Sequence, residues 1–165
     1  MRSFLISMFI FLAACSIRTP EQRLDNLERA QTFELWSAQR TTQNADELRV
    51  VEFELVRRGE FRSGRSFVGQ RSAASIGQSV FERNAGDGSD LFNCSDFPNS
   101  ISAQREFIRS GGPANDPNSL DADGDGFACE WGTEIRRIAR NARPRPAAVI
   151  RSPARITRPR CHIGP

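Results

Sequence analysis

The stretch DADGDGFACE, residues 121–130, carries the clearest chemical pattern in the sequence. Its three alternating aspartates and the glycine after them match the first half of the D-x-D-x-D-G calcium-loop pattern. Calcium takes about six to eight oxygen ligands, and alternating carboxylates on a tightly curled loop converge on one point. Gly126 permits the sharp turn that directs the Phe127 carbonyl toward the same point. Carboxylates this close repel one another without a cation, so the pattern predicts a Ca²⁺ site; Mg²⁺ demands a stricter octahedral geometry.

This loop departs from an ordinary EF-hand. The twelfth loop residue, which supplies a bidentate glutamate in the EF-hand, is Gly132 here, and the nearest acid is Glu130 at the tenth position. Pro113 and Pro117 also oppose a long helix directly before Asp121. The sequence therefore predicts a different kind of calcium loop.

Cys94, the aspartate pattern and the closing Ala128-Cys129-Glu130 together resemble the Excalibur domain, a small extracellular calcium-binding region of bacterial surface and secreted proteins. The resemblance covers about a quarter of the chain, residues 92–132. It implies a disulfide between Cys94 and Cys129, which in the chain-entropy model contributes about 3–4 kcal/mol and holds Glu130 beside the aspartates. The implied side-chain ligands of the calcium ion are Asp121, Asp123, Asp125 and Glu130. We expect a dissociation constant of about 10⁻⁴ to 10⁻³ M, the range of extracellular modules.

The first half of the chain predicts two helices. Thr19 and Pro20 form a helix start, and a stripe of Leu24, Leu27, Leu35 and Ala38 follows. After a polar break at residues 40–43, Asn44 is a plausible cap for a second helix that ends near Gly59. Two amphipathic helices with a short connection predict an antiparallel hairpin within residues 15–59. We interpret its apolar stripes as core; a partner-binding surface is the alternative.

The remaining segments complete the expected fold class, which is mainly α with irregular loops. Residues 60–91 show no dominant period and predict an irregular connector. Residues 101–109 predict a helix ahead of the calcium loop, and Gly111-Gly112-Pro113 ends it. Residues 136–160 contain nine arginines, four prolines and no acid, so we expect the tail, residues 133–165, to be largely disordered after its first turn or two.

The N-terminal residues predict export. Arg2, an apolar run and Leu12-Ala13-Ala14-Cys15 resemble a signal peptide, residues 1–14, ending in the lipobox of bacterial lipoproteins. That resemblance implies a lipid on Cys15, which would anchor the chain to a membrane. Because Ser16 provides no acidic inner-membrane retention signal, we expect the outer membrane facing the periplasm, or the cell surface. The alternative is an ordinary signal peptide with an incidental cysteine.

The basic tail is the second feature that suggests a partner. The sequence has no lysine, and its net charge is only +3, yet arginines concentrate near the end. They suit an anionic lipid surface or cell-envelope polymer, or form a solvated linker; nucleic acid has little support because no aromatic residues interleave them. Cys161 and His162 allow a zinc site with the other cysteines, a cross-link to another chain, or the cut end of a longer protein.

The sequence does not predict an enzyme. Its one histidine is His162, no serine or cysteine has an obvious base partner, and no phosphate-binding glycine loop occurs. The predicted function is that of a cell-envelope lipoprotein that binds calcium and serves as an interaction module. The alternative is a calcium-dependent nuclease or nuclease accessory protein, because Excalibur regions sometimes accompany nuclease domains.

Overall fold

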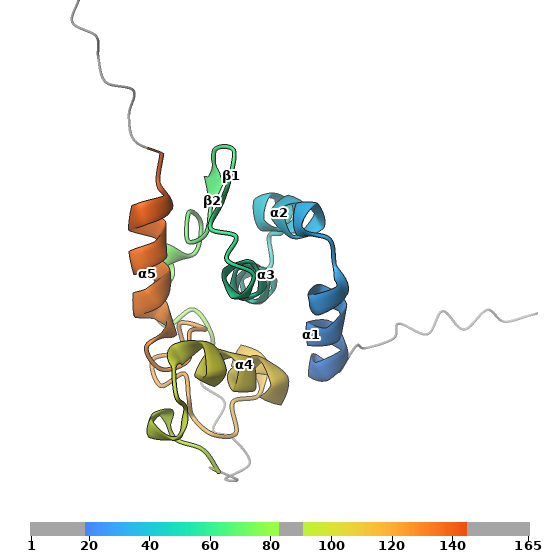
Figure 1. Cartoon of the computed structure of the whole chain (residues 1–165). Coiled ribbons are helices and arrows are strands. Elements are labelled where there is room, and N and C mark those ends of the chain that lie inside the picture. The colour runs from blue at the N-terminus through green and yellow to red at the C-terminus, as the bar shows by residue number, and fades with distance from the viewer. Residues whose placement is uncertain (1–18, 83–90, 145–165) are drawn as a thin grey trace, which may run out of the picture.

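The computed structural model describes residues 19–82 and 91–144 (Figure 1). The expectations for the signal segment, Cys15, the tail beyond residue 144, Cys161 and His162 lie outside this range. The helices are α1 (Pro20–Arg29), α2 (Thr32–Thr41), α3 (Ala45–Arg57), α4 (Ser100–Ser110) and α5 (Trp131–Ala142). Two short strands, β1 (Arg62–Ser63) and β2 (Ser66–Phe67), and three 3-10 turns, Ala73–Ser75, Cys94–Asp96 and Gly112–Ala114, complete the elements. The predicted class, mainly α with irregular loops, is confirmed.

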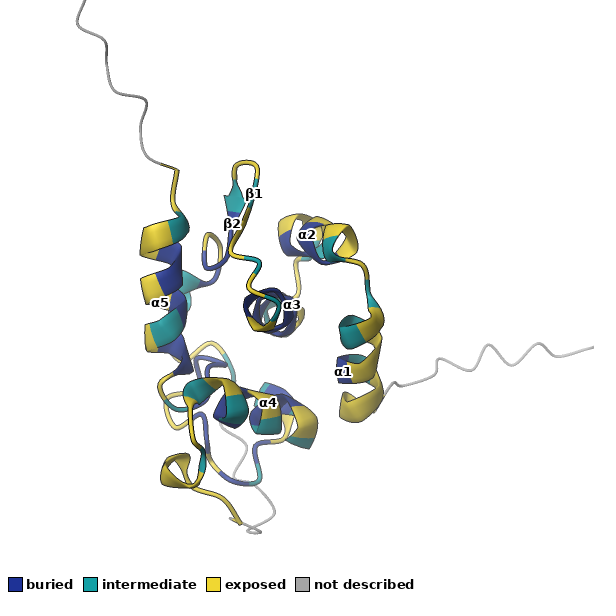
Figure 2. Ribbon diagram, viewed as in Figure 1, coloured by how far each residue is buried: buried dark blue, intermediate teal, exposed yellow. Residues whose placement is uncertain are grey.

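Helix α3 lies at the centre of the fold, with the other helices around it (Figure 1). Asn44 caps its start by accepting a hydrogen bond from the N–H of Glu47 at 3.0 Å, as the sequence predicts. All nine residues 48–56 are buried, so this helix is covered on every side rather than along one stripe (Figure 2). Its central position lets α3 pack against α1, α2 and α4 and, through Phe53, against Trp131 of α5.

The predicted first helix is two helices. α1 ends at Arg29, and α2 begins after Gln31, whose N–H donates to the Glu34 carboxylate at 2.7 Å while its carbonyl oxygen accepts from the N–H of Glu34 at 2.9 Å. Arg58 donates hydrogen bonds to the carbonyl oxygens of Leu27 at 2.8 Å and Ala30 at 2.8 Å. These bonds satisfy the Ala30 carbonyl and give a second partner to the Leu27 carbonyl, which also accepts from the N–H of Ala30, so Arg58 stabilises the break. The predicted hairpin is therefore α2 packed on α3, while α1 packs on α4.

The connector after α3 folds back on that helix. β1 and β2 pair antiparallel, with Arg62 opposite Phe67, as a short two-stranded hairpin within it. Glu52 of α3, which is fully buried, accepts hydrogen bonds from the N–H of Gly69 at 3.0 Å and from Ser72 and Gln39. This buried carboxylate joins α2, α3 and the connector.

Helix α5 includes the first turns of the basic tail. The tail was expected to be largely disordered after its first turn or two, and the helix continues to Ala142; the residues beyond 144 lie outside the described range. Its apolar residues Trp131, Ile135 and Ile138 enter the core, where Trp131 meets the ring of Phe53 edge-on at 5.8 Å. Burial of this face stabilises the helix despite its many arginines.

One core holds the two halves of the described chain together, and a disulfide closes a loop within the second half. The core runs from Leu24 in α1 to Ile138 in α5, so the hairpin and the loop region are parts of one packed body. Cys94 and Cys129 form the disulfide that the Excalibur resemblance implies, with 5.7 Å between their Cα atoms. Among the described residues, no helix has the length and apolar character needed to cross a bilayer.

Candidate metal site

The aspartate loop has a fixed base. The Asp116 carboxylate accepts hydrogen bonds from the N–H groups of Leu120 at 3.0 Å and Asp121 at 2.9 Å, which turns the chain into the loop. At the other end, the N–H of Cys129 donates to the carbonyl oxygen of Leu120 at 2.9 Å. The disulfide at Cys129 then ties this closed loop to the segment before α4.

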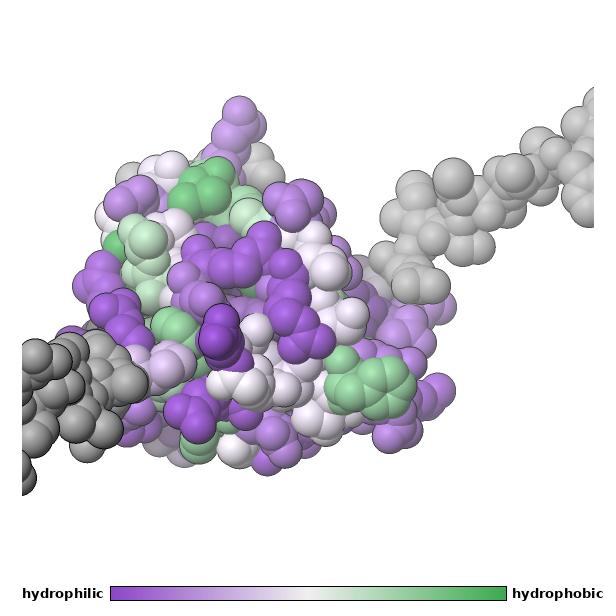
Figure 3. Space-filling view, turned by 90° about the horizontal axis from the view of Figure 1, so that it is seen from above, coloured by the Kyte–Doolittle hydropathy of each residue, from purple (hydrophilic) through white to green (hydrophobic). Residues whose placement is uncertain are grey.

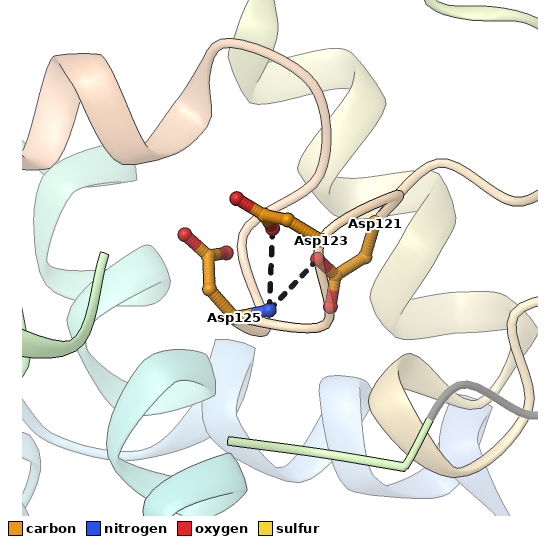
Figure 4. A group of neighbouring side chains, drawn as sticks. All are labelled: Asp121, Asp123 and Asp125. Carbon is orange, nitrogen blue, oxygen red and sulfur yellow. Dashed lines mark hydrogen bonds between the residues drawn. The ribbon is translucent and has the colours of Figure 1, made fainter. Parts of the chain in front are cut away.

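The three aspartates gather as the sequence predicts. Each of Asp121, Asp123 and Asp125 offers a carboxylate oxygen, and these oxygens all lie within 4.8 Å of one another. Asp121 and Asp125 are buried and Asp123 is exposed, so the group opens to solvent on one side. In Figure 4 the carboxylates surround one small region, and the N–H of Asp125 donates to both other aspartates, at 3.1 Å and 3.3 Å.

Asp121 curls the loop. Its carboxylate also accepts hydrogen bonds from the N–H of Gly124 at 3.1 Å and from the N–H of Gly126 at 2.7 Å. Gly126 adopts a φ of +83°, a left-handed conformation that a side chain disfavours. A Cβ atom there would also lie 2.5 Å from Arg49. The predicted need for glycine at this turn therefore has both a conformational and a steric reason.

The electrostatics of the group suit a cation. Burial raises the pKa of Asp121 to about 7; the N–H of Gly126 opposes this shift and the charge of Asp125 adds to it. Burial likewise raises the pKa of Asp125, against the hydrogen bonds from Gly77 and Phe127. Neighbouring carboxylates that are costly to ionise gain most from a divalent ion, and a donor set made only of oxygen suits a hard one such as Ca²⁺.

Arg49 of α3 is the cation that already contacts the loop. Its Nε donates to the carbonyl oxygen of Asp125 at 2.7 Å, and its guanidinium lies between two rings, 4.9 Å from Phe81 and 4.8 Å from Phe127. Burial lowers the pKa of Arg49, and the charge of Asp125 opposes that shift. Arg49 thus fixes the position of the loop backbone from the centre of the fold.

Residues 75–81 cover another side of the loop. The N–H of Gly77 donates to the second carboxylate oxygen of Asp125 at 2.5 Å. The N–H groups of Val80 and Phe81 both donate to the carbonyl oxygen of Gly124 at 2.9 Å. On α4, the Gln104 side chain accepts a hydrogen bond from the N–H of Ala128 at 2.7 Å. The loop is therefore held by three parts of the fold besides its own hydrogen bonds.

The two other predicted ligands are placed differently from the aspartates. Glu130 is exposed at the start of α5 and is not part of the three-aspartate group, although it lines the same hollow of about 490 Å³ as Asp123, Asp125 and Arg136. The Phe127 ring is buried, and its N–H donates to the Asp125 carboxylate at 2.8 Å. The ligand roles of Glu130 and of the Phe127 carbonyl stay predictions.

The sequence did not reveal three groups that build the site, Asp116, Arg49 and the N–H of Gly77. A local signal existed for Asp116, because aspartate followed by Pro117 favours a turn that its carboxylate stabilises. Arg49 stands between the apolar Leu48 and Val50, which marks it as a cation on a buried part of the helix. Nothing in the sequence around Gly77 indicated that its N–H contacts the aspartate loop.

Comparison of this chain with known proteins identified no related family, protein or structure. No family model matches this chain, and neither the curated proteins nor the solved structures contain a match to it. The resemblance to the Excalibur domain accordingly rests on Cys94, the aspartate pattern and Ala128-Cys129-Glu130 alone.

Proposed function

We propose that the chain is a cell-envelope lipoprotein that binds Ca²⁺ through Asp121, Asp123 and Asp125. The observation that carries the proposal is the convergence of these three carboxylates within 4.8 Å on a loop already curled around Asp121. Because backbone hydrogen bonds to Asp121 and the contacts with α3, α4 and residues 75–81 hold the loop in its curl, little ordering opposes binding. The Phe127 carbonyl, Glu130 and water are the proposed sources of the remaining oxygens, since Ca²⁺ takes about six to eight.

The calcium ion has a structural role in this proposal. The loop contacts α3, α4 and residues 75–81, so neutralising its carboxylates strengthens the packing of all three. The ordered surface around the loop then serves as an interaction module. Lipid attached at Cys15 holds this module at a bacterial membrane, in our proposal the outer membrane facing the periplasm or the cell surface. Mass spectrometry of the mature protein tests the anchor: a diacylglyceryl mass that Cys15→Ser removes supports it, and an unmodified cysteine rejects it.

Calorimetric titration of the mature protein with CaCl₂ tests the metal site. We expect a dissociation constant of about 10⁻⁴ to 10⁻³ M and at least about tenfold weaker binding by Asp123→Asn, because the exposed Asp123 contributes charge without a role in the core. Asp25→Asn, which removes an exposed carboxylate from α1, is the matched control and should leave binding unchanged. No calcium response up to about ten millimolar, roughly ten times the weak end of the range, would reject the site.

A nuclease assay separates this proposal from the enzymatic alternative. Calcium-dependent cleavage of nucleic acid that disappears in Asp123→Ala would favour a nuclease. Calcium binding without cleavage supports the interaction module.

A further inference from the structure

Helix α5 has two chemically opposite faces. One face is buried, and the other exposes the arginines of the helix to solvent, as the yellow and dark blue halves of α5 show (Figure 2). We call this exposed side the arginine face; it consists of Arg136, Arg137 and Arg140 in the helix and Arg143 at its C-terminal cap. Their spacing places them along one side of a fixed helix, which the sequence alone did not predict.

Some of these arginines are paired within the described fold, and others are not. Arg137 pairs with Glu134, with 2.5 Å between nitrogen and oxygen, and Arg136 donates to the carbonyl oxygen of Ile76 at 2.7 Å. Within residues 19–82 and 91–144, the side chains of Arg140 and Arg143 have neither an ion pair nor a hydrogen bond. The sequence contains no acid after Glu134, so no neighbouring residue along the chain neutralises them.

The arginine face lies on the side of the fold away from the proposed anchor. The described chain begins at α1 and ends after α5, and these helices form opposite sides of the molecule in Figure 1. Seen from above, the surface of the fold is mostly hydrophilic, with small apolar patches (Figure 3). Cys15 lies four positions before Thr19, a reach of at most about 14 Å, whereas a domain of this size is about 35 Å across. Salt screens charges beyond about 8 Å, so the anchoring membrane exerts little field on α5.

We propose that the arginine face of α5 binds an anionic cell-wall polymer, of which carboxylate-bearing peptidoglycan is the tested case. For a protein anchored in the outer membrane and facing the periplasm, the wall is the polyanionic layer on the side away from that membrane. The guanidinium group suits it because arginine binds carboxylates in a planar, two-pronged geometry. This proposal rests on the lipid anchor proposed above for its orientation, and it is independent of the calcium site.

Cosedimentation of the mature full-length protein with purified peptidoglycan sacculi tests the proposal. We expect the protein to pellet with the sacculi, and Arg140→Gln/Arg143→Gln to weaken binding about fivefold or more, since each exposed cation near an anionic surface contributes severalfold. The matched control is Arg29→Gln/Arg40→Gln, which removes two exposed arginines from the last turns of α1 and α2 that have no ion pair with any described residue. The control should bind like the wild type, and unchanged melting temperatures show that both variants fold.

Three results would overturn the proposal. Absence of pelleting, or an equal loss in both double variants, means that α5 has no special role. Tighter binding to phosphatidylglycerol vesicles or to duplex DNA than to sacculi means that another polyanion is the partner. Repeating the assay in calcium and in chelator separates the two proposals, because sacculus binding that persists in chelator stands even if the calcium site fails, and mass spectrometry reports on the anchor independently.

Discussion

Replacement of Glu52 by glutamine should change how the stability of the fold depends on pH. Burial raises the pKa of Glu52, against the hydrogen bonds from Ser72, Gly69 and Gln39 and the charge of Arg49. Above about pH 4.3 the unfolded chain releases this proton while the folded chain retains it, so wild-type stability falls as pH rises toward the folded pKa. Glutamine has no proton to release. The variant therefore gains stability relative to the wild type by up to about 1.4 kcal/mol per pH unit across that window.

The hydrogen bonds that Glu52 accepts determine how much stability each substitution costs. A glutamine at position 52 can still accept from Gly69 and Gln39 and can donate to the Ser72 hydroxyl oxygen, so Glu52→Gln should fold normally. Glu52→Ala leaves the buried Gly69 N–H and Ser72 hydroxyl without that partner and should cost about 2–6 kcal/mol. Urea unfolding of both variants from about pH 4.5 to pH 8, with calcium absent, measures these differences. Parallel stability curves for wild type and Glu52→Gln would refute the reasoning, because they would show that Glu52 ionises in the folded state as it does in the unfolded one.

Three further predictions concern the loop and its supports. Cys94→Ser/Cys129→Ser, which opens a loop spanning 35 positions, should lower the free energy of unfolding by about 3–4 kcal/mol; an unchanged urea midpoint would contradict this. Gly126→Ala should weaken calcium binding at least about tenfold because of the left-handed φ and the contact with Arg49, whereas Gly59→Ala, with open space around it, should leave calcium affinity unchanged in the same titration. Arg49→Gln should destabilise the calcium-free fold by about 2–4 kcal/mol through the loss of charge-assisted hydrogen bonds, and thermal unfolding at wild-type stability would refute its role.

The sequence predicted those features of the fold that depend on residues close to one another along the chain. Thr19 and Asn44 start helices by capping their first N–H groups, and Gly59 ends one with a positive φ, as their residue types indicate. The convergence of the three aspartates followed from their alternation. The break at Ala30 was missed because the apolar spacing continues across it, while the reciprocal pair Gln31 and Glu34 marks the new helix start.

The other differences come from contacts distant in sequence. The sequence did not predict the full length of helix α5, because the burial of Ile135 and Ile138 against distant residues stabilises it. Arg49 reaches Asp125 across 76 positions, and Gly77 reaches the same residue across 48. No periodicity within one segment indicates such a partner, so the aspartates were predicted from the sequence but their supports in α3 and in residues 75–81 were not.

The melting temperature of the mature protein in Ca²⁺ and in chelator tests the calcium site most directly. For a dissociation constant of about 10⁻⁴ to 10⁻³ M, about 5 mM Ca²⁺ stabilises the fold by about 1–2.5 kcal/mol, equivalent to a rise of about 3–10 °C. We predict this rise for the wild type and its loss in Asp123→Asn. Equal melting temperatures in Ca²⁺ and in chelator would contradict the proposal that a divalent ion completes this loop.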